Sequence, residues 1–175
     1  MVVELDEPIE VVAYDPSWPA WYAQDAEQLR GTLAEPLLEL AHFGSTSVPG
    51  LVAKPVIDIL VALPSWPLAA DARARLEALG YEYLGEAGVP GREYLRRRAQ
   101  HSTNLAVVRK PSPLWDDNLA VRDYLIAHPN IATKYGESKR AVWARGARTL
   151  LEYSRAKHAF VSELVANARN WRSSR

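Results

Sequence analysis

The feature that most constrains the fold of this chain is an apolar run over residues 56–63, Val-Ile-Asp-Ile-Leu-Val-Ala-Leu, which one acid interrupts. A nearly continuous apolar stretch of this length, bounded by turn residues, is typical of a strand with both faces buried. A loop rich in Gly, Ser and Pro precedes it over residues 44–55. The sequence therefore predicts a sheet with this strand near its centre.

The rest of the first part of the chain alternates between helical and extended patterns. A helix is predicted to open at Asp15-Pro16-Ser17, because proline is tolerated in the first turn and aspartate or serine can cap it. A second helix is predicted over residues 71–79, closed by Gly80. Extended segments are expected at residues 9–13, 37–43, 81–84, 92–98 and 103–109, the last two as a hairpin.

Residues 112–171 are predicted to be helical, in three helices broken near Pro129 and Gly146. These patterns together predict an α+β fold, with a mixed β-sheet flanked by helices and a helical C-terminal part. The length of 175 residues suits one domain. We expect that domain to span residues 1–175, with an α/β core at about 1–110 and the helical part at about 112–171.

Composition narrows the classes of function. The 21 basic and 21 acidic residues balance, so a nucleic-acid partner is disfavoured, and the absence of cysteine removes disulfides, thiolate metal sites and cysteine nucleophiles. No stretch reaches the roughly 18 apolar residues of a membrane span, and no secretory leader pattern is visible. We expect a cytoplasmic protein with no membrane partner.

The loop between the two expected strands carries the strongest functional signal. Residues 42–55 read His-Phe-Gly-Ser-Thr-Ser-Val-Pro-Gly-Leu-Val-Ala-Lys-Pro. Glycine lets the backbone approach an anion, and the hydroxyls of Ser45, Thr46 and Ser47 add donors. Lys54 adds a positive charge. The pattern predicts a phosphate-binding loop that begins at Gly44, although it lacks the spacing of a Walker loop.

A purely structural interpretation of this loop has about equal weight. In it the glycines only form turns and the hydroxyls bond to neighbouring backbone. Asp58 then anchors the loop by accepting hydrogen bonds. In either case an ionised carboxylate inside an apolar strand implies a cation, a metal or several donors beside it.

Residues 42–59 closely resemble the signature of the GrpB family, also known as UPF0157, which is assigned to the nucleotidyltransferase superfamily. The resemblance extends from Tyr14-Asp15-Pro16-Ser17-Trp18 through Tyr153 to Trp171. It implies a nucleotidyltransferase-like fold in which a Gly-Ser pair after the first strand holds a triphosphate. It also implies two acids, one residue apart, on the next strand and a third acid on a later strand, with magnesium ions between these acids and the phosphates.

This chain matches that pattern only in part. Gly44 and Ser45 match the loop and Asp58 matches the first acid, as catalytic and metal-binding residue, but Leu60 occupies the position of the second. Asn104 is the polar candidate on the later strand. The resemblance then implies one magnesium ion, bridged by Asp58 and the phosphates of the nucleotide. Glu82 or Glu93 could supply a further ligand.

Other candidate residues flank the loop. Arg96 and Arg98 share a strand face and could hold phosphate oxygens, although a solvated face is the commoner reason for such a run. His101 in the hairpin turn could move a proton or bind a ligand, or simply be exposed. His42 is interpreted as a structural residue with a minor chance of touching ligand.

Two lysines on the expected C-terminal helices repeat one pattern. Lys139 follows Tyr135 by four residues and Lys157 follows Tyr153 by four, so each lysine shares a helix face with a tyrosine. Either lysine could close over a phosphate ligand or extend to solvent along its aliphatic stem.

The hypothesis from the sequence is a nucleotidyltransferase-fold protein that binds a nucleotide or similar phosphate ligand between Gly44 and Lys54. Such a protein could transfer a nucleotidyl or pyrophosphoryl group with magnesium. The alternative is a non-catalytic module that binds a ligand or a protein partner. Because GrpB-like domains also occur fused to dephospho-coenzyme A kinases, the resemblance implies assistance to such a kinase as one form of this alternative.

Overall fold

The computed structural model describes residues 5–33, 37 and 39–175. Its sheet has the order β1-β2-β5-β4-β3, in which β2 and β5 run parallel and the other pairs run antiparallel. The expected α+β class with a mixed sheet is therefore confirmed. The strands are β1 (Glu39–Phe43), β2 (Val56–Leu63), β3 (Glu82–Tyr83), β4 (Arg92–Arg98) and β5 (Ser102–Arg109).

The apolar run is a central strand, as predicted. It forms β2 with the expected bounds, paired to β1 on one side and β5 on the other. Alternate side chains enter two cores. Ile57, Ile59 and Val61 pack on one face, whereas Leu60 and Ala62 pack on the opposite face, the face that also carries Asp58.

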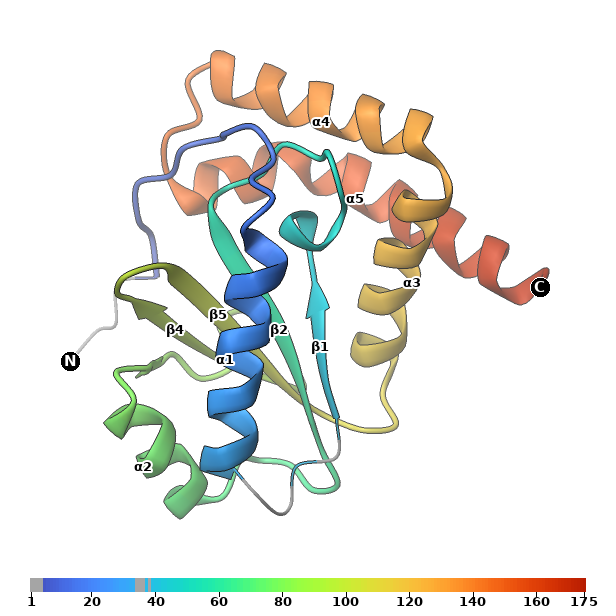
Figure 1. The fold of residues 1–175 in the computed structure, drawn as a ribbon. Coiled ribbons are helices and arrows are strands. Elements are labelled where there is room, and N and C mark those ends of the chain that lie inside the picture. The colour runs from blue at the N-terminus through green and yellow to red at the C-terminus, as the bar shows by residue number, and fades with distance from the viewer. Residues whose placement is uncertain (1–4, 34–36, 38) are drawn as a thin grey trace.

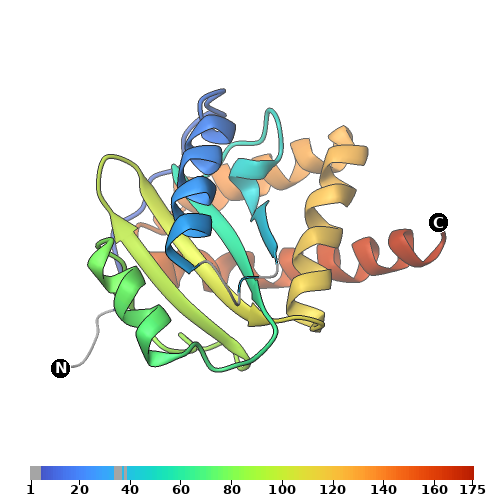
Figure 2. The ribbon, with the colours of Figure 1, turned by 60° about the horizontal axis from the view of Figure 1, so that its bottom comes forward.

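Helices cover both faces and one end of the sheet. The first core joins the sheet to α1 (Trp18–Leu33) and α2 (Ala70–Ala78), and the second joins it to α3 (Pro113–Ala127). Figures 1 and 2 show α4 (Pro129–Ala144) and α5 (Leu150–Ser173) together beyond the end where β2 begins. The predicted helical C-terminal part is therefore confirmed, with breaks at Pro129 and Gly146. No helix of the described residues is long and apolar enough to span a membrane.

Local capping explains where these helices begin. The carboxylate of Asp15 accepts hydrogen bonds from the backbone and hydroxyl of Ser17, one residue before α1. The Ser112 hydroxyl accepts from the backbone of Trp115 at the start of α3. Thr149 and Glu152 form a capping box at the start of α5. Each cap satisfies helix donors that have no partner within the helix.

Two expected strands are shorter than their patterns indicated. The segment expected at 81–84 pairs only at Glu82–Tyr83, because Gly80 and Gly85 turn the chain at φ values of 86° and 63°. The segment expected at 37–43 pairs from Glu39, and its residue 38 lies outside the described residues. Of the extended lead expected at 9–13, Val12 forms an isolated bridge with Ala53.

The start of the described chain packs against the start of α5. We call residues 5–9 the N-terminal strap. Its backbone joins Glu7 O to Leu150 N at 2.8 Å, and Ile9 N to Arg148 O at 2.9 Å. The carboxylate of Asp6 accepts from Leu151 N at 2.9 Å. The strap therefore lies along the start of α5 (Figure 1).

Candidate functional site

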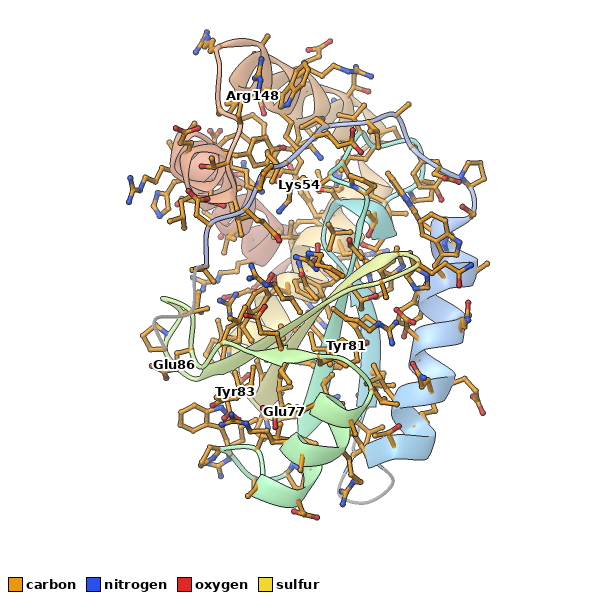
Figure 3. The ribbon with its side chains drawn as sticks, turned by 90° about the vertical axis from the view of Figure 1, so that its left-hand side faces the viewer. Lys54, Glu77, Tyr81, Tyr83, Glu86 and Arg148 are labelled. Carbon is orange, nitrogen blue, oxygen red and sulfur yellow. The ribbon has the colours of Figure 1, made fainter. Side chains whose placement is uncertain are left out.

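A cavity of about 410 Å³ lies between the second face of the sheet, the loop after β1, and helices α4 and α5. Figure 3 shows Lys54 in this region, between the sheet and the C-terminal helices. Among the residues that the structure describes, four basic side chains and one carboxylate line the cavity. They are Lys54, Arg92, Lys139, Lys157 and Asp58, and the wall also includes Phe43, Gly44, Ser45, Tyr94, Asn104, Tyr135 and Tyr153.

The backbone of Gly44 allows the loop to lie directly against Asp58. Gly44 has a φ of 70°, and a Cβ added to it would lie 2.6 Å from Oδ2 of Asp58. Any other residue would therefore meet both an unfavourable backbone conformation and a steric clash. A short 3₁₀ turn over Ser45–Ser47 follows. Glycine at this position brings the turn onto the end of the central strand.

The three hydroxyls of the turn do not all face the cavity. Ser45 lines the cavity. The Ser47 hydroxyl donates to Gly44 O at 2.6 Å, and the Thr46 hydroxyl donates to Val56 O at 3.2 Å. The purely structural interpretation of the loop thus describes Thr46 and Ser47, while Gly44 and Ser45 remain candidates for contact with a ligand.

Asp58 is held at the cavity wall by Asn104. Nδ2 of Asn104, on the neighbouring strand β5, donates to Oδ1 of Asp58 at 2.8 Å. Burial raises the pKa of Asp58, and the positive charges of Lys54 and Lys157 oppose that rise. A carboxylate in an apolar strand was expected to have a polar partner. For Asp58 that partner is the amide of Asn104, together with the nearby charges of Lys54 and Lys157.

Lys139 is the most buried charged group of the site, with 1% of its surface exposed. Its Nζ donates to the hydroxyl of Ser45 at 2.9 Å and to the carbonyl oxygen of Val52. It also lies 4.4 Å from the ring centroid of Tyr135. Burial, with Lys157 as the next cause, lowers the pKa of Lys139 to about 6.

The other two predicted lysines also reach the cavity. Burial lowers the pKa of Lys54 to about 8, against the opposing effect of Asp58. Burial also lowers the pKa of Lys157, whose Nζ lies 4.9 Å from the ring centroid of Tyr153. The structure thus brings three lysines together around one cavity. Lys139 follows Lys54 by 85 residues in the sequence, and Lys157 follows Lys54 by 103 residues.

Tyr153 is fully packed in the same wall. Its side chain is 1% exposed, and its hydroxyl has no hydrogen-bond partner among the described residues. Burial raises the pKa of this phenol. Tyr153 therefore places one hydroxyl without a described partner at the cavity wall.

Arg92 is a cavity residue that the sequence analysis missed. Two backbone oxygens, of Glu86 and Ala87, accept from its Nη2 at 3.2 Å, while its buried Nε has no partner among the described residues. Tyr94 lies two positions further along the same strand face and also lines the cavity. The period-two pattern that linked Arg96 to Arg98 extends back to both residues, so a longer window would have found them.

Arg96 and Arg98 share a face, as predicted, but the protein's own acids engage them. Glu7 of the N-terminal strap accepts from Nη2 of Arg98 at 2.6 Å and from Nη1 of Arg96 at 3.5 Å. Glu82 also accepts from Arg96, at 2.7 Å. Arg98 bonds to Oδ1 of Asn104 at 3.1 Å as well. Neither arginine is among the residues that line the cavity.

The two candidate histidines point to the α1 side of the sheet. His42 stacks on Tyr22 of α1 at 4.8 Å and bonds to the Thr46 hydroxyl at 3.0 Å, and burial lowers its pKa to about 4. His101 stacks on Trp21 and bonds to Asp25 at 3.0 Å. The structural interpretation thus fits His42, and His101 is neither exposed nor close to the cavity.

The donor set does not fit a magnesium ion held by the protein alone. Magnesium prefers several oxygen ligands in octahedral geometry, and Asp58 is the one carboxylate in the lining that the structure describes. Oδ1 of Asn104 already accepts from Arg98. Among residues 5–33, 37 and 39–175, no group of three or more His, Cys, Asp or Glu side chains could hold a metal.

The two acids considered as further ligands are engaged elsewhere. Glu93 lies on the opposite face of β4, where it is 4% exposed and accepts from Leu68 N and from the Tyr83 hydroxyl. Glu82 pairs with Arg96. Neither carboxylate lines the cavity.

Known proteins resemble this chain over most of its length. A UPF0157 protein of Pseudomonas aeruginosa is 37% identical over 166 residues, which cover 93% of this chain and 69% of that protein. The UPF0157 protein YqkA of Bacillus subtilis is 29% identical over 168 residues, covering 95% of this chain and 49% of YqkA. The chain thus spans about half the length of that relative.

A dephospho-CoA kinase of Mycolicibacterium paratuberculosis is 25% identical over 193 residues, covering 95% of this chain and 47% of the kinase. Among solved structures, Cid1 in complex with the UTP analog UMPNPP aligns distantly, at 16% identity and a TM-score of 0.43 over 73% of this chain and 41% of that chain.

A much closer structural match is the crystal structure of the conserved protein GrpB from Enterococcus faecalis. It has a TM-score of 0.85 and 33% identity, over 93% of this chain and 99% of that chain. The family model described as GrpB protein matches residues 8–167, which includes every cavity-lining residue except Leu5. The chain therefore belongs to the GrpB family.

Proposed function

We propose that the cavity binds the phosphate groups of a nucleotide or a similar small molecule. The observation that carries this proposal is that, within the described part of the chain, four basic side chains and one carboxylate line a cavity of about 410 Å³. Buried ammonium groups are costly without a counter-charge, and the lowered pKa of Lys54 expresses that cost. A bound anion would supply the missing negative charge.

The size and the apolar wall of the cavity suit a nucleotide. Ligand pockets commonly measure about 300–1,000 Å³ and combine apolar surface with a few placed polar groups. Phe43 and Tyr94 supply aromatic surface beside the cations. An aromatic base or an apolar tail could lie against them while the phosphates meet Lys54, Lys157 and Arg92.

Charge neutralisation in this proposal comes from the protein's cations. If the nucleotide carried a magnesium ion, Asp58 would be the cavity carboxylate available to bind it. A two-metal transfer uses more acids than this one. We therefore propose phosphate binding as the function, and transfer of a nucleotidyl or pyrophosphoryl group only as the reaction class that the family resemblance suggests.

Calorimetric titration tests the proposal. Tripolyphosphate and each nucleoside triphosphate are titrated into the protein, with and without magnesium. Binding that persists without magnesium and weakens about tenfold or more in Lys157→Met and Arg92→Met supports it, because a bond to a charged group contributes about 1.5–3 kcal/mol. Lys134→Met, which removes an exposed lysine from α4, is the matched control. Equal affinity in all variants, or no binding, overturns the proposal.

A second candidate rests on the similarity to the mycobacterial dephospho-CoA kinase, in which the matched part is about half of the protein. Here the chain would act as a non-catalytic module that presents or holds a coenzyme A precursor, or contacts such a kinase. Dephospho-coenzyme A in the same titration distinguishes the two. Tighter binding of this compound than of any nucleoside triphosphate favours the module.

A further inference from the structure

Ser45 and Lys139 form a bonded pair at the cavity wall. Nζ of Lys139 lies 2.9 Å from the hydroxyl oxygen of Ser45, although 94 residues separate them in the chain. Both residues line the cavity, and Ser45 is partly exposed there, whereas Lys139 is 1% exposed. A hydroxyl that faces a cavity, with a buried amine behind it, is the arrangement in which a serine can be activated.

The surroundings of Lys139 favour its neutral form. Lys54 from the loop, Lys157 from α5 and Arg140 from α4 all disfavour a charge on it, and burial disfavours that charge most. Tyr135 lies beneath Nζ and is itself buried. A neutral amine has two hydrogens and one lone pair. One hydrogen can stay on the carbonyl of Val52 while the lone pair accepts the proton of Ser45.

We propose that Ser45 is a nucleophile and Lys139 its general base, in attack on the phosphorus of a phosphate anhydride held in the cavity. This inference rests on the proposed function for its substrate, since the cationic lining selects phosphoryl compounds. It goes beyond binding because it assigns a covalent step to a hydroxyl that binding alone would use only as a donor.

The step balances without a redox partner. The Ser45 oxygen forms a bond to phosphorus, its proton moves to Nζ of Lys139, and the bond from phosphorus to the bridging oxygen breaks with its electron pair on the departing phosphate. Lys157 and Arg92 line the same cavity and would neutralise that leaving group. The product is a phosphoserine at position 45, and water returns it to serine and phosphate.

A neutral probe tests the pair independently of phosphate binding. Diisopropyl phosphorofluoridate is incubated with the full chain, and adducts are mapped by peptide mass spectrometry. We expect modification of Ser45, with fluoride as leaving group and a rate that rises with pH around 6, as Lys139 loses its proton. No adduct on Ser45 of the folded protein, or a rate that does not change between pH 5 and 9, overturns the proposal.

Variants test whether Lys139 activates the Ser45 hydroxyl or whether an exposed serine alone accounts for the adduct. Ser45→Ala should abolish the adduct, whereas Ser47→Ala, whose hydroxyl bonds to Gly44 O, should retain it. Lys139→Arg replaces the amine by a donor that stays protonated and cannot act as a base, so the rate should fall about 100-fold or more. An unchanged rate in folded Lys139→Arg overturns the role of Lys139. If that variant does not fold, the pH profile of the unaltered protein decides.

The proposal and the proposed function fail in different ways. A protein that binds tripolyphosphate but forms no adduct has the binding function and no activated serine. If the protein forms the adduct but binds no phosphate compound, Ser45 is activated. A phosphate anhydride is then not its substrate.

Discussion

Asn104 donates a hydrogen bond of 2.8 Å from Nδ2 to Oδ1 of Asp58, across the parallel pair of strands β5 and β2. The amide of Asn104 therefore occupies a position from which a carboxylate could share one bound cation with Asp58. It satisfies Asp58 without adding negative charge. The positive character of the cavity comes from the basic side chains in its lining, which are Lys54, Arg92, Lys139 and Lys157.

Replacing that amide by an acid should create a metal site. In Asn104→Asp two carboxylates would lie side by side, and such a pair binds a divalent cation to relieve its repulsion. We expect magnesium to raise the melting temperature of Asn104→Asp and to leave that of the unaltered protein unchanged. Asn170→Asp, on the exposed surface of α5, controls for the added charge. An equal response of the two variants to magnesium would contradict the prediction.

The close approach of Gly44 to Asp58 should make position 44 intolerant of substitution. Gly44→Ala adds the clash at 2.6 Å to the cost of a positive-φ extended backbone that is essentially restricted to glycine, which alone is about 1–3 kcal/mol. Gly50→Ala is the matched control, because Gly50 has a φ of 78° and no atom within 4 Å of an added Cβ. Urea denaturation should show a clearly larger loss of unfolding free energy for Gly44→Ala. Equal losses would mean that the loop moves away at no cost.

Lys139 should make the stability of the protein depend on pH. Its pKa is about 6 when folded and about 10.4 when unfolded, so between these values the unfolded chain binds the extra proton. The free energy of unfolding therefore rises with pH, by up to about 1.4 kcal/mol per unit from this group. Denaturation at pH 6.5, 7.5 and 8.5 should show a shallower rise in Lys139→Met, but not in Lys134→Met. Parallel slopes would refute the assignment.

The Asp25 cluster should matter for stability and not for phosphate binding. Asp25 is 2% exposed and accepts from Arg97 at 2.6 Å, from His101 at 3.0 Å and from the Thr103 hydroxyl. Asp25→Asn leaves Arg97, whose side chain is only 11% exposed, without its charge partner, which costs about 3 kcal/mol. Asp71→Asn, which removes an exposed pair with Arg75, should cost less than about 1 kcal/mol. A large loss of phosphate affinity in Asp25→Asn would contradict the placement of His101 away from the cavity.

Local patterns were sufficient to predict most of the fold. The bounds of β2 and β4 and the three C-terminal helices follow from hydrophobic periodicity and from Pro and Gly. The order of the strands does not follow from them. That β5 inserts between β2 and β4 depends on which apolar faces pack together, and no window of the sequence contains that information.

The sequence patterns predicted loop residues and lysines that line the cavity, but they did not predict which arginine does. Lys139 and Lys157 each follow a tyrosine on a helix face, and both reach the cavity. Arg98 instead pairs with Glu7, 91 residues earlier, an interaction that depends on where the strap lies. Whether Ser45, Asp58 and the lysines bind a ligand stays a prediction that the titrations address.

The pairing of Glu7 with Arg98 makes the strap an intramolecular competitor for anions. A tethered carboxylate is present at a high effective concentration that a free ligand must exceed, and the same segment occupies the first amides of α5. Arg98 and the first amides of α5 therefore already have acceptors from the strap when no ligand is bound. Selectivity among anions is left to Lys54, Lys157 and Arg92, so ligands should be ranked by their fit to these three cations and not by total charge.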